Sequence, residues 1–271
     1  MEGMARSSDK SITLVLFRGP HFPASHNYAK GYLQNYLSIK VDVLVSDMPD
    51  VIANYHLCDA ATKCAIKAAR IPSDVSGNAA SCAELSIYLM MGLLRKQIGL
   101  FNLIPDSHSS FLNEMRMAIE QKKLRVPTGE TLLGKTVFIS GFGNIEVELA
   151  KRLRPFGVKI IAAKRIWASH SQVCCQSSGS LLVNIVRGGL LDYEAVAHYL
   201  ESGHLGGLGL DVAWTEPFDP NDPILKFQSV LITPHVGGVT EHSYRSTAKV
   251  VGDVALQLHA GTPLTGIEPV N

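Results

Sequence analysis

The segment from Lys135 to Arg165, KTVFISGFGNIEVELAKRLRPFGVKIIAAKR, decides the fold that we predict for this chain. Residues Thr136 to Ser140 favour a short strand, and the Gly-Phe-Gly that follows allows a tight turn. Apolar residues then recur at helical spacing up to Gly157, a residue typical of a helix end. Val158 to Ala162 favours a second buried strand. The segment therefore predicts a strand, helix and strand unit.

The glycine turn in this unit predicts a nucleotide site. A strand that runs through glycines into a helix offers backbone N–H groups and the positive end of the helix dipole to a phosphate. Gly141 and Gly143 fit the first two positions of the dinucleotide fingerprint GxGxxG, and Asn144 can cap the helix. Glu146 stands where a third, small residue is expected. Two glycines alone are a weak signal, and the elements around them strengthen it.

The second strand of the unit ends in Lys164 and Arg165. An acidic residue at this place would bond to the ribose 2′-hydroxyl of NAD, whereas a basic pair favours the 2′-phosphate of NADP. We therefore expect NAD(P) as cofactor, with a preference for NADP. The other interpretation is a pair of solvated basic residues at a strand end.

Composition narrows the class of protein. The chain has 271 residues, 46% of them hydrophobic, and 25 Lys and Arg balance 24 Asp and Glu for a net charge of +1. This predicts a globular protein and gives no sign of nucleic acid or a membrane surface as partner. Five cysteines without CxxC spacing suggest neither a disulfide framework nor a zinc site. We expect no metal and a cytosolic location.

Several other elements are predicted along the chain. Strands are expected at Ile12 to Phe17, Val41 to Val45, Ile66 to Ile71, Leu181 to Val186, Leu208 to Val212 and Val230 to Thr233. Helices are expected at Ala79 to Leu94, Leu112 to Lys123 and Tyr193 to Ser202, with caps at Asn78 and Asp192, and a last helix starts at Thr240 and stops at Gly261. We expect the last helix to bury Tyr244, Ala248, Val251, Ala255 and Leu258.

Three of these strands lead into residues that can carry chemistry. Arg187, Glu216 and His235 follow successive strands, and ligands gather at the carboxyl ends of parallel strands. Arginine can hold a carboxylate, and histidine can protonate an oxyanion when a carboxylate orients it. Each residue also has a structural interpretation, as an ion-pair partner, a turn or a cap. Asp211 could contact a nicotinamide amide or bond to backbone.

The motifs GFGNIEVELAKRL, LLVNIVRGGLLD, GLGLDVAWTEP and ITPHVGG, in this order, resemble the D-isomer-specific 2-hydroxyacid dehydrogenases. This family includes phosphoglycerate dehydrogenase, hydroxypyruvate and glyoxylate reductases and formate dehydrogenase. The resemblance implies that Arg187 orients the substrate, that His235 is the acid/base and that Glu216 is its partner. With the glycine turn, it implies that the cofactor is lined by Gly141, Gly143, Asn144, Ile145, Lys164, Arg165, Ile185, Val186, Arg187, Asp211, His235, Gly237 and Gly238.

This sequence departs from the family pattern at two places. The family normally has more chain between Cys58 and Asp59, including a loop whose backbone N–H groups hold the substrate carboxylate. It also has a further strand, helix and strand between Arg165 and Leu181. With Glu146 in the third glycine position, these losses suggest an internally deleted form.

We therefore predict an α/β protein of two Rossmann-like, doubly wound domains, both incomplete. Residues 1–74 and 242–271 would form the smaller, substrate-binding domain, and residues 75–241 the dinucleotide-binding domain. The resemblance implies an NAD(P)H-dependent oxidoreductase that interconverts small 2-oxoacids and D-2-hydroxyacids, and a homodimer. Two alternatives stay open: a non-catalytic protein that dimerises or binds a partner, and another Rossmann enzyme, such as an epimerase or dehydratase with tightly held NAD.

Overall fold

The computed structural model describes residues 12–18, 31, 34–35, 41–47, 69–97, 128–163 and 178–269. The chain divides into two compact units, Met1–Ser81 with Gly238–Asn271, and Cys82–Gly237. The predicted boundaries at 74/75 and 241/242 lie close to these divisions and stay a prediction. Three predicted features lie wholly or partly outside the described residues: the helix Leu112 to Lys123, the Lys164 and Arg165 pair, and the first part of the strand Ile66 to Ile71.

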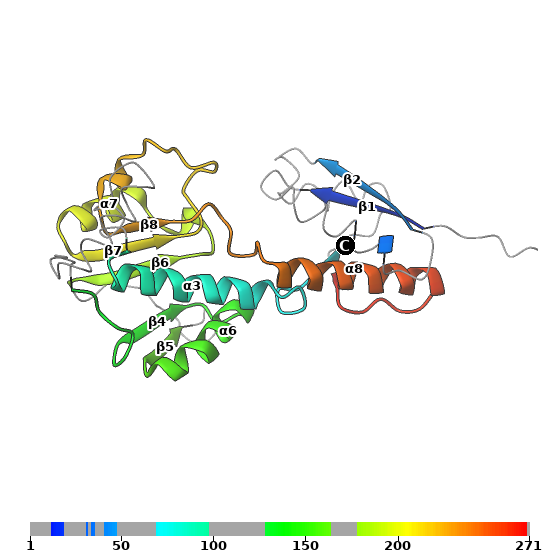
Figure 1. Cartoon of the computed structure of the whole chain (residues 1–271), viewed down its shortest axis with the longest axis horizontal. Coiled ribbons are helices and arrows are strands. Elements are labelled where there is room, and N and C mark those ends of the chain that lie inside the picture. Colours follow the sequence, from blue (N-terminus) through cyan, green and yellow to red (C-terminus); the bar gives the residue numbers. More distant parts are fainter. Residues whose placement is uncertain are drawn as a thin grey trace, which may run out of the picture. The chain divides into compact units, whose positions relative to one another are not determined.

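The first unit contains a parallel pair of strands, a short antiparallel pair and a long helix (Figure 1). β1 (Ile12–Arg18) runs parallel to β2 (Val41–Asp47), with Ile12 opposite Val41. β3 (Ala69–Arg70) pairs antiparallel with β9 (Glu268–Pro269), a strand that the sequence did not predict. α8 (Glu241–Ala260) begins one residue after the predicted start, Thr240, which is its N-cap and whose hydroxyl accepts a hydrogen bond from the Ser243 N–H.

The buried face of α8 differs in part from the prediction. Ala248 and Ala255 are buried as expected, but Leu258 is 56% exposed. Ser243, Val250 and Gly252 are buried instead. The prediction was wrong for Leu258: apolar spacing continues the stripe to this residue, but it lies in the last turn, just before Gly261 ends the helix with a left-handed φ of 66°.

The second unit contains two sets of parallel strands. β4 (Thr136–Ser140) pairs with β5 (Lys159–Ala163). β6 (Ser180–Asn184), β7 (Leu205–Leu210) and β8 (Val230–Ile232) form a second sheet in that order. α6 (Asn144–Leu153), continued by η2 (Arg154–Phe156), connects β4 to β5, and α7 (Tyr193–Glu201) connects β6 to β7. Parallel strands joined by helices confirm the predicted α/β class.

The helix α3 (Asn78–Leu94) lies between the two sets of strands (Figure 1). On one side it packs against β7, where Gly207 and Gly209 leave room for it: a Cβ on Gly209 would lie 3.2 Å from the Leu89 Cβ. On the other side Ala83 and Leu94 join a buried cluster with Leu132, Ile139, Leu149 and Leu153. In the described parts of the chain, no helix combines the length and apolar character needed to cross a membrane.

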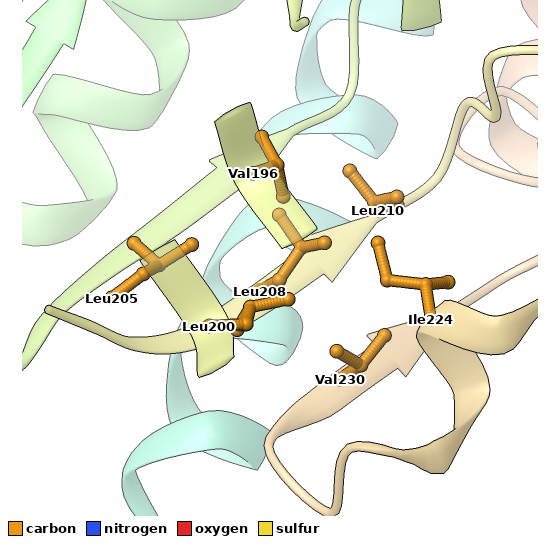
Figure 2. Packing of buried hydrophobic residues seen from close by; sticks show 7 residues of the cluster. All are labelled: Val196, Leu200, Leu205, Leu208, Leu210, Ile224 and Val230. Atoms are coloured by element: carbon orange, nitrogen blue, oxygen red, sulfur yellow. The ribbon is translucent and has the colours of Figure 1, made fainter. Parts of the chain in front are cut away.

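A second cluster holds the sheet that carries the candidate site. Figure 2 shows aliphatic side chains of α7, β7, the 3₁₀ turn η4 (Pro223–Lys226) and β8 pointing toward one another. Each buried Val, Leu or Ile of this kind contributes about 1.5–3 kcal/mol relative to an exposed one. The members are Val196, Leu200, Leu205, Leu208, Leu210, Ile224 and Val230.

The β4–β5 pair buries one face only. Val137, Ile139, Ile160 and Ala162, which alternate along the two strands, all pack in the cluster around α3 and α6. On the opposite face Phe138 and Ile161 stand opposite each other in register and are 43% and 42% exposed. Parallel sheets normally cover both faces.

Candidate active site

His235 and Glu216 form a hydrogen-bonded pair on neighbouring loops of the second unit. The Nδ1 of His235 donates to Oε2 of Glu216 at 2.8 Å. His235 has a left-handed φ of 55°, and its N–H bonds to the Thr233 carbonyl just after β8. The two side chains are 34% and 23% exposed, so the pair is partly shielded from water and still open to a ligand.

The loop after β7 fixes the carboxylate of this pair. The Ala213 N–H donates to Oε1 of Glu216 at 3.2 Å, while Oε2 accepts from the imidazole. A carboxylate held in this way keeps the ring proton on Nδ1, which leaves Nε2 basic, and it stabilises the ring when it is protonated. The arrangement is therefore suited to moving a proton through Nε2.

Asp211 supports the turn that carries His235. Its Oδ1 accepts hydrogen bonds from the Thr233 hydroxyl (2.6 Å) and the Val236 N–H (2.8 Å), and its Oδ2 accepts from the Gly237 N–H (2.8 Å). The side chain is 2% exposed. Of the two interpretations of Asp211, a nicotinamide contact or bonds to backbone, the structure displays the second. It clamps the end of β7 to the turn after β8.

Cys82 lies against this clamp and is chemically quiet. Burial, and then the nearby charge of Asp211, raise the pKa of the Cys82 thiol to about 11. The thiol therefore stays protonated at neutral pH and is no candidate nucleophile.

The turn that carries Arg187 is shaped by Asn184, a residue that sequence reasoning missed. Asn184 is buried at the end of β6; its amide donates to the Arg187 carbonyl at 2.7 Å and accepts from the Val186 N–H at 3.1 Å. The exposed guanidinium of Arg187 donates to the Val186 carbonyl at 2.6 Å. The signal was present, because Asn is a common turn former at strand ends.

Gly188 brings this turn against the loop of Glu216. A Cβ on Gly188 would lie 1.8 Å from the Ala213 carbonyl oxygen and 2.8 Å from the Trp214 nitrogen. The indole of Trp214 also donates to the Leu191 carbonyl at 2.8 Å. The structure thus joins Glu216 and His235 directly and packs the Arg187 turn against the same loop, all following the carboxyl ends of β6, β7 and β8.

The glycine turn after β4 is hydrogen-bonded to a carboxylate of the same chain, that of Glu146. α6 begins at Asn144, and its N-cap is Gly143 rather than the predicted Asn144. Glu146, the third residue of the helix, returns its Oε2 to the Gly143 N–H at 2.8 Å, which fixes this start. Gly141 has a φ of 111°, open to glycine only. Backbone and helix end thus suit a phosphate group, and the Glu146 carboxylate stands in its place.

The remaining predicted cofactor residues differ in burial and in the elements that carry them. Ile145 is half-buried in the first turn of α6, and Ile185 and Val186 lie in the turn after β6. Gly237 and Gly238 follow His235, and each has a packing reason to be glycine: a Cβ would lie 2.9 Å from the Asp211 carboxylate or 2.2 Å from the Asn78 amide oxygen, respectively. Lys164 and Arg165 lie outside the described residues. That these residues contact a cofactor stays a prediction.

Comparisons with known proteins agree with the motifs. The family model "D-isomer specific 2-hydroxyacid dehydrogenase, NAD binding domain" matches residues 175–237. The chain is 27% identical over 237 residues to D-3-phosphoglycerate dehydrogenase of Archaeoglobus fulgidus, covering 71% of this chain and 42% of that protein. It is 32% identical over 165 residues to hydroxypyruvate reductase of Thermotoga maritima, covering 46% of this chain and 52% of the relative. The chain spans about half the length of these curated relatives.

The fold is similar to solved structures of reductases. The crystal structure of an NADPH-dependent glyoxylate/hydroxypyruvate reductase of Sinorhizobium meliloti superposes with a TM-score of 0.66 at 18% identity, covering 96% of this chain and 97% of that one. This likeness concerns the fold alone. The similarity in sequence to the D-isomer specific 2-hydroxyacid dehydrogenases rests on the family-model match over residues 175–237 and on the two relatives above.

Proposed function

We propose that this chain is an NAD(P)H-dependent oxidoreductase that interconverts small 2-oxoacids and D-2-hydroxyacids. The observation that carries the proposal is the hydrogen bond between His235 and Glu216. The imidazole follows β8, and the carboxylate that orients it follows the neighbouring parallel strand, β7. The relatives named as dehydrogenases and reductases of such acids support this reaction class.

Each residue has a role in this reaction. When bound, the cofactor supplies the hydride. His235 gives its Nε2 proton to the substrate oxygen during reduction and takes one back during oxidation. Glu216 holds the ring and stabilises its protonated form, and Arg187 binds the substrate carboxylate through its fork of donors.

The cofactor would be held by its charge. Gly141, Gly143 and the start of α6 would bind the pyrophosphate once the Glu146 carboxylate has moved. Lys164 and Arg165 favour NADP over NAD. Small oxoacids such as hydroxypyruvate and glyoxylate, a homodimer and a cytosolic location complete the proposal.

One alternative has an observation in its favour. A family member with little or no activity could keep the scaffold and bind a partner or a second copy. The carboxylate on Gly143 and the two segments that the family has and this sequence lacks all affect binding surfaces. Such a protein would be folded but would bind the nucleotides weakly or not at all.

The test is a titration of the purified chain with NADPH and NADH, followed by oxidation of the bound cofactor on adding hydroxypyruvate or glyoxylate. His235→Ala should lower turnover by about 10²–10⁴-fold, a much larger effect than any change in nucleotide binding from its predicted contact with the cofactor. His198→Ala, an exposed histidine on α7, is the matched control and should keep full activity. A folded chain that binds neither nucleotide, or a His235→Ala variant with normal turnover, would overturn the proposal. Retained NAD without net hydride transfer would point instead to an epimerase or dehydratase.

A further inference from the structure

The side chain of Glu146 covers both glycines of the turn after β4. Its Oε2 accepts a hydrogen bond from the Gly143 N–H at 2.8 Å. A Cβ built on Gly143 would meet Oε2 at 3.1 Å, and one on Gly141 would meet Oε1 at 3.5 Å. The carboxylate therefore lies across the open side of the turn, with one oxygen toward each glycine.

A dinucleotide needs the same place. Glycines in such a turn let the pyrophosphate approach the backbone, and the helix N-terminus attracts its negative charge. The Gly143 N–H cannot serve the carboxylate and a phosphate oxygen at once, and two anions a few ångströms apart repel each other.

From this geometry we propose that Glu146 is a built-in competitor of the cofactor's pyrophosphate, which sets the affinity of the site. The dinucleotide binds when the carboxylate swings off Gly143, and the carboxylate returns when the dinucleotide leaves. This inference rests on the proposed function, because it concerns the same cofactor turn.

The obstacle is movable. The nearest atoms that a Cβ on Gly141 or Gly143 would meet belong to the Glu146 side chain, which is half-buried and has three rotatable bonds. The backbone of the turn need not change. Gly188 provides the contrast, because the atoms that crowd it are backbone atoms of Ala213 and Trp214. Glu146 therefore weakens binding without closing the site.

The experiment measures dissociation constants of NADPH and NADH by nicotinamide fluorescence for the full chain and two variants. Glu146→Gln removes the charge and Glu146→Ala removes the whole obstacle. Each should tighten both nucleotides by about tenfold or more at low salt, and the gain over the native chain should shrink as ionic strength rises. Glu194→Gln, which makes the same charge change in the first turn of α7, is the matched control and should change nothing.

Thermal unfolding without nucleotide gives a second readout. Glu146→Ala should lower the melting temperature slightly, because α6 loses the bond to Gly143. With NADPH added, the variant should melt at a higher temperature than the native chain, because it binds the nucleotide more tightly. A cap with no other role would lower the melting temperature and leave both dissociation constants as they were.

The outcomes separate this inference from the proposed function. Equal binding by the native chain and both variants overturns the role of Glu146 and leaves the oxidoreductase proposal intact. Binding by the variants alone supports the competitor and shows that the native chain does not work as a reductase. No binding by any folded variant overturns both.

Discussion

At the scale of single residues, two adjacent glycines differ sharply in the room around them. A Cβ on Gly188 would collide with the Ala213 carbonyl, whereas a Cβ on Gly189 would meet nothing within 4 Å. Gly188→Ala should therefore push the Arg187 turn away from the Glu216 loop and destabilise the fold by about 1–3 kcal/mol. Gly189→Ala should be close to neutral. Urea denaturation of both variants checks this, and equal midpoints would contradict it.

The polar residues of the site could be predicted from the sequence to different degrees. Glu216 and His235 could be placed together because each follows a strand of one parallel sheet, and they share a hydrogen bond. The role of Asp211 could not be decided from the sequence. Only the conformation of the turn after β8 shows that its carboxylate bonds to one hydroxyl and two backbone N–H groups. The residue type of Asn184 indicates a turn, but the backbone groups that it bonds to, like the position of the Glu146 carboxylate, depend on the local turn geometry.

At the scale of elements, α7 is tied to η4 and to the Glu216 loop. The Tyr193 hydroxyl donates to Oδ1 of Asp222 at 2.7 Å, and its ring meets Trp214 edge-on at 5.0 Å. The bond to Asp222, and then burial, raise the pKa of Tyr193 to about 12. The folded state therefore holds the phenol proton more tightly than the unfolded chain does.

Tyr193→Phe should lower the free energy of unfolding at pH 7 by about 1–2 kcal/mol, since Asp222 loses a donor. The stabilisation from this hydroxyl is complete below the unfolded pKa of about 10 and is lost as the pH rises through about 12. The difference between native chain and variant should shrink over that range in urea denaturation. Tyr199→Phe, at a 47% exposed tyrosine of the same helix, serves as control; a constant difference up to pH 12 would refute the linkage.

Most elements of the second unit could be predicted, and the ends of some of them could not. The strand at Thr136 to Ser140 matches β4 because β-prone residues and a glycine turn bound it on the C-terminal side. β7 begins at Leu205, three residues before the predicted start, because Gly206 and Gly207 gave no strand signal although both pack closely against neighbours. A glycine that is needed for close packing cannot be told from a loop glycine in the sequence alone.

At the scale of the whole molecule, the face of the β4–β5 pair that carries Phe138 and Ile161 exposes apolar surface, which favours dye binding and association. Replacing Phe138 by Ser and Ile161 by Thr together should reduce binding of the dye ANS and light scattering at high concentration. The free energy of unfolding should change by about 1 kcal/mol or less, because both side chains are more than a third exposed. Ile139→Thr, on the packed face, should instead destabilise the chain. Unchanged dye binding in the double variant would contradict the prediction.

The internal losses expected between Cys58 and Asp59 and between Arg165 and Leu181 stay a prediction. The match to the Archaeoglobus fulgidus enzyme runs over 237 residues but takes in 71% of this 271-residue chain, so some positions of the relative have no counterpart here. Among the described residues, one face of β4 and β5 is covered, whereas parallel sheets normally cover both.

The proposed acid–base pair and its supports lie in one uninterrupted stretch of chain. Asn184 shapes the first turn, Asp211 and Glu216 follow the next strand, and the Asp211 clamp ends at Gly237, the last residue of the second unit. The family model matches this same stretch. The same stretch also holds predicted cofactor residues, from Ile185 to Arg187 and at Gly237, so a loss of coding sequence before residue 178 would leave the acid–base pair and this part of the cofactor site together in one chain segment.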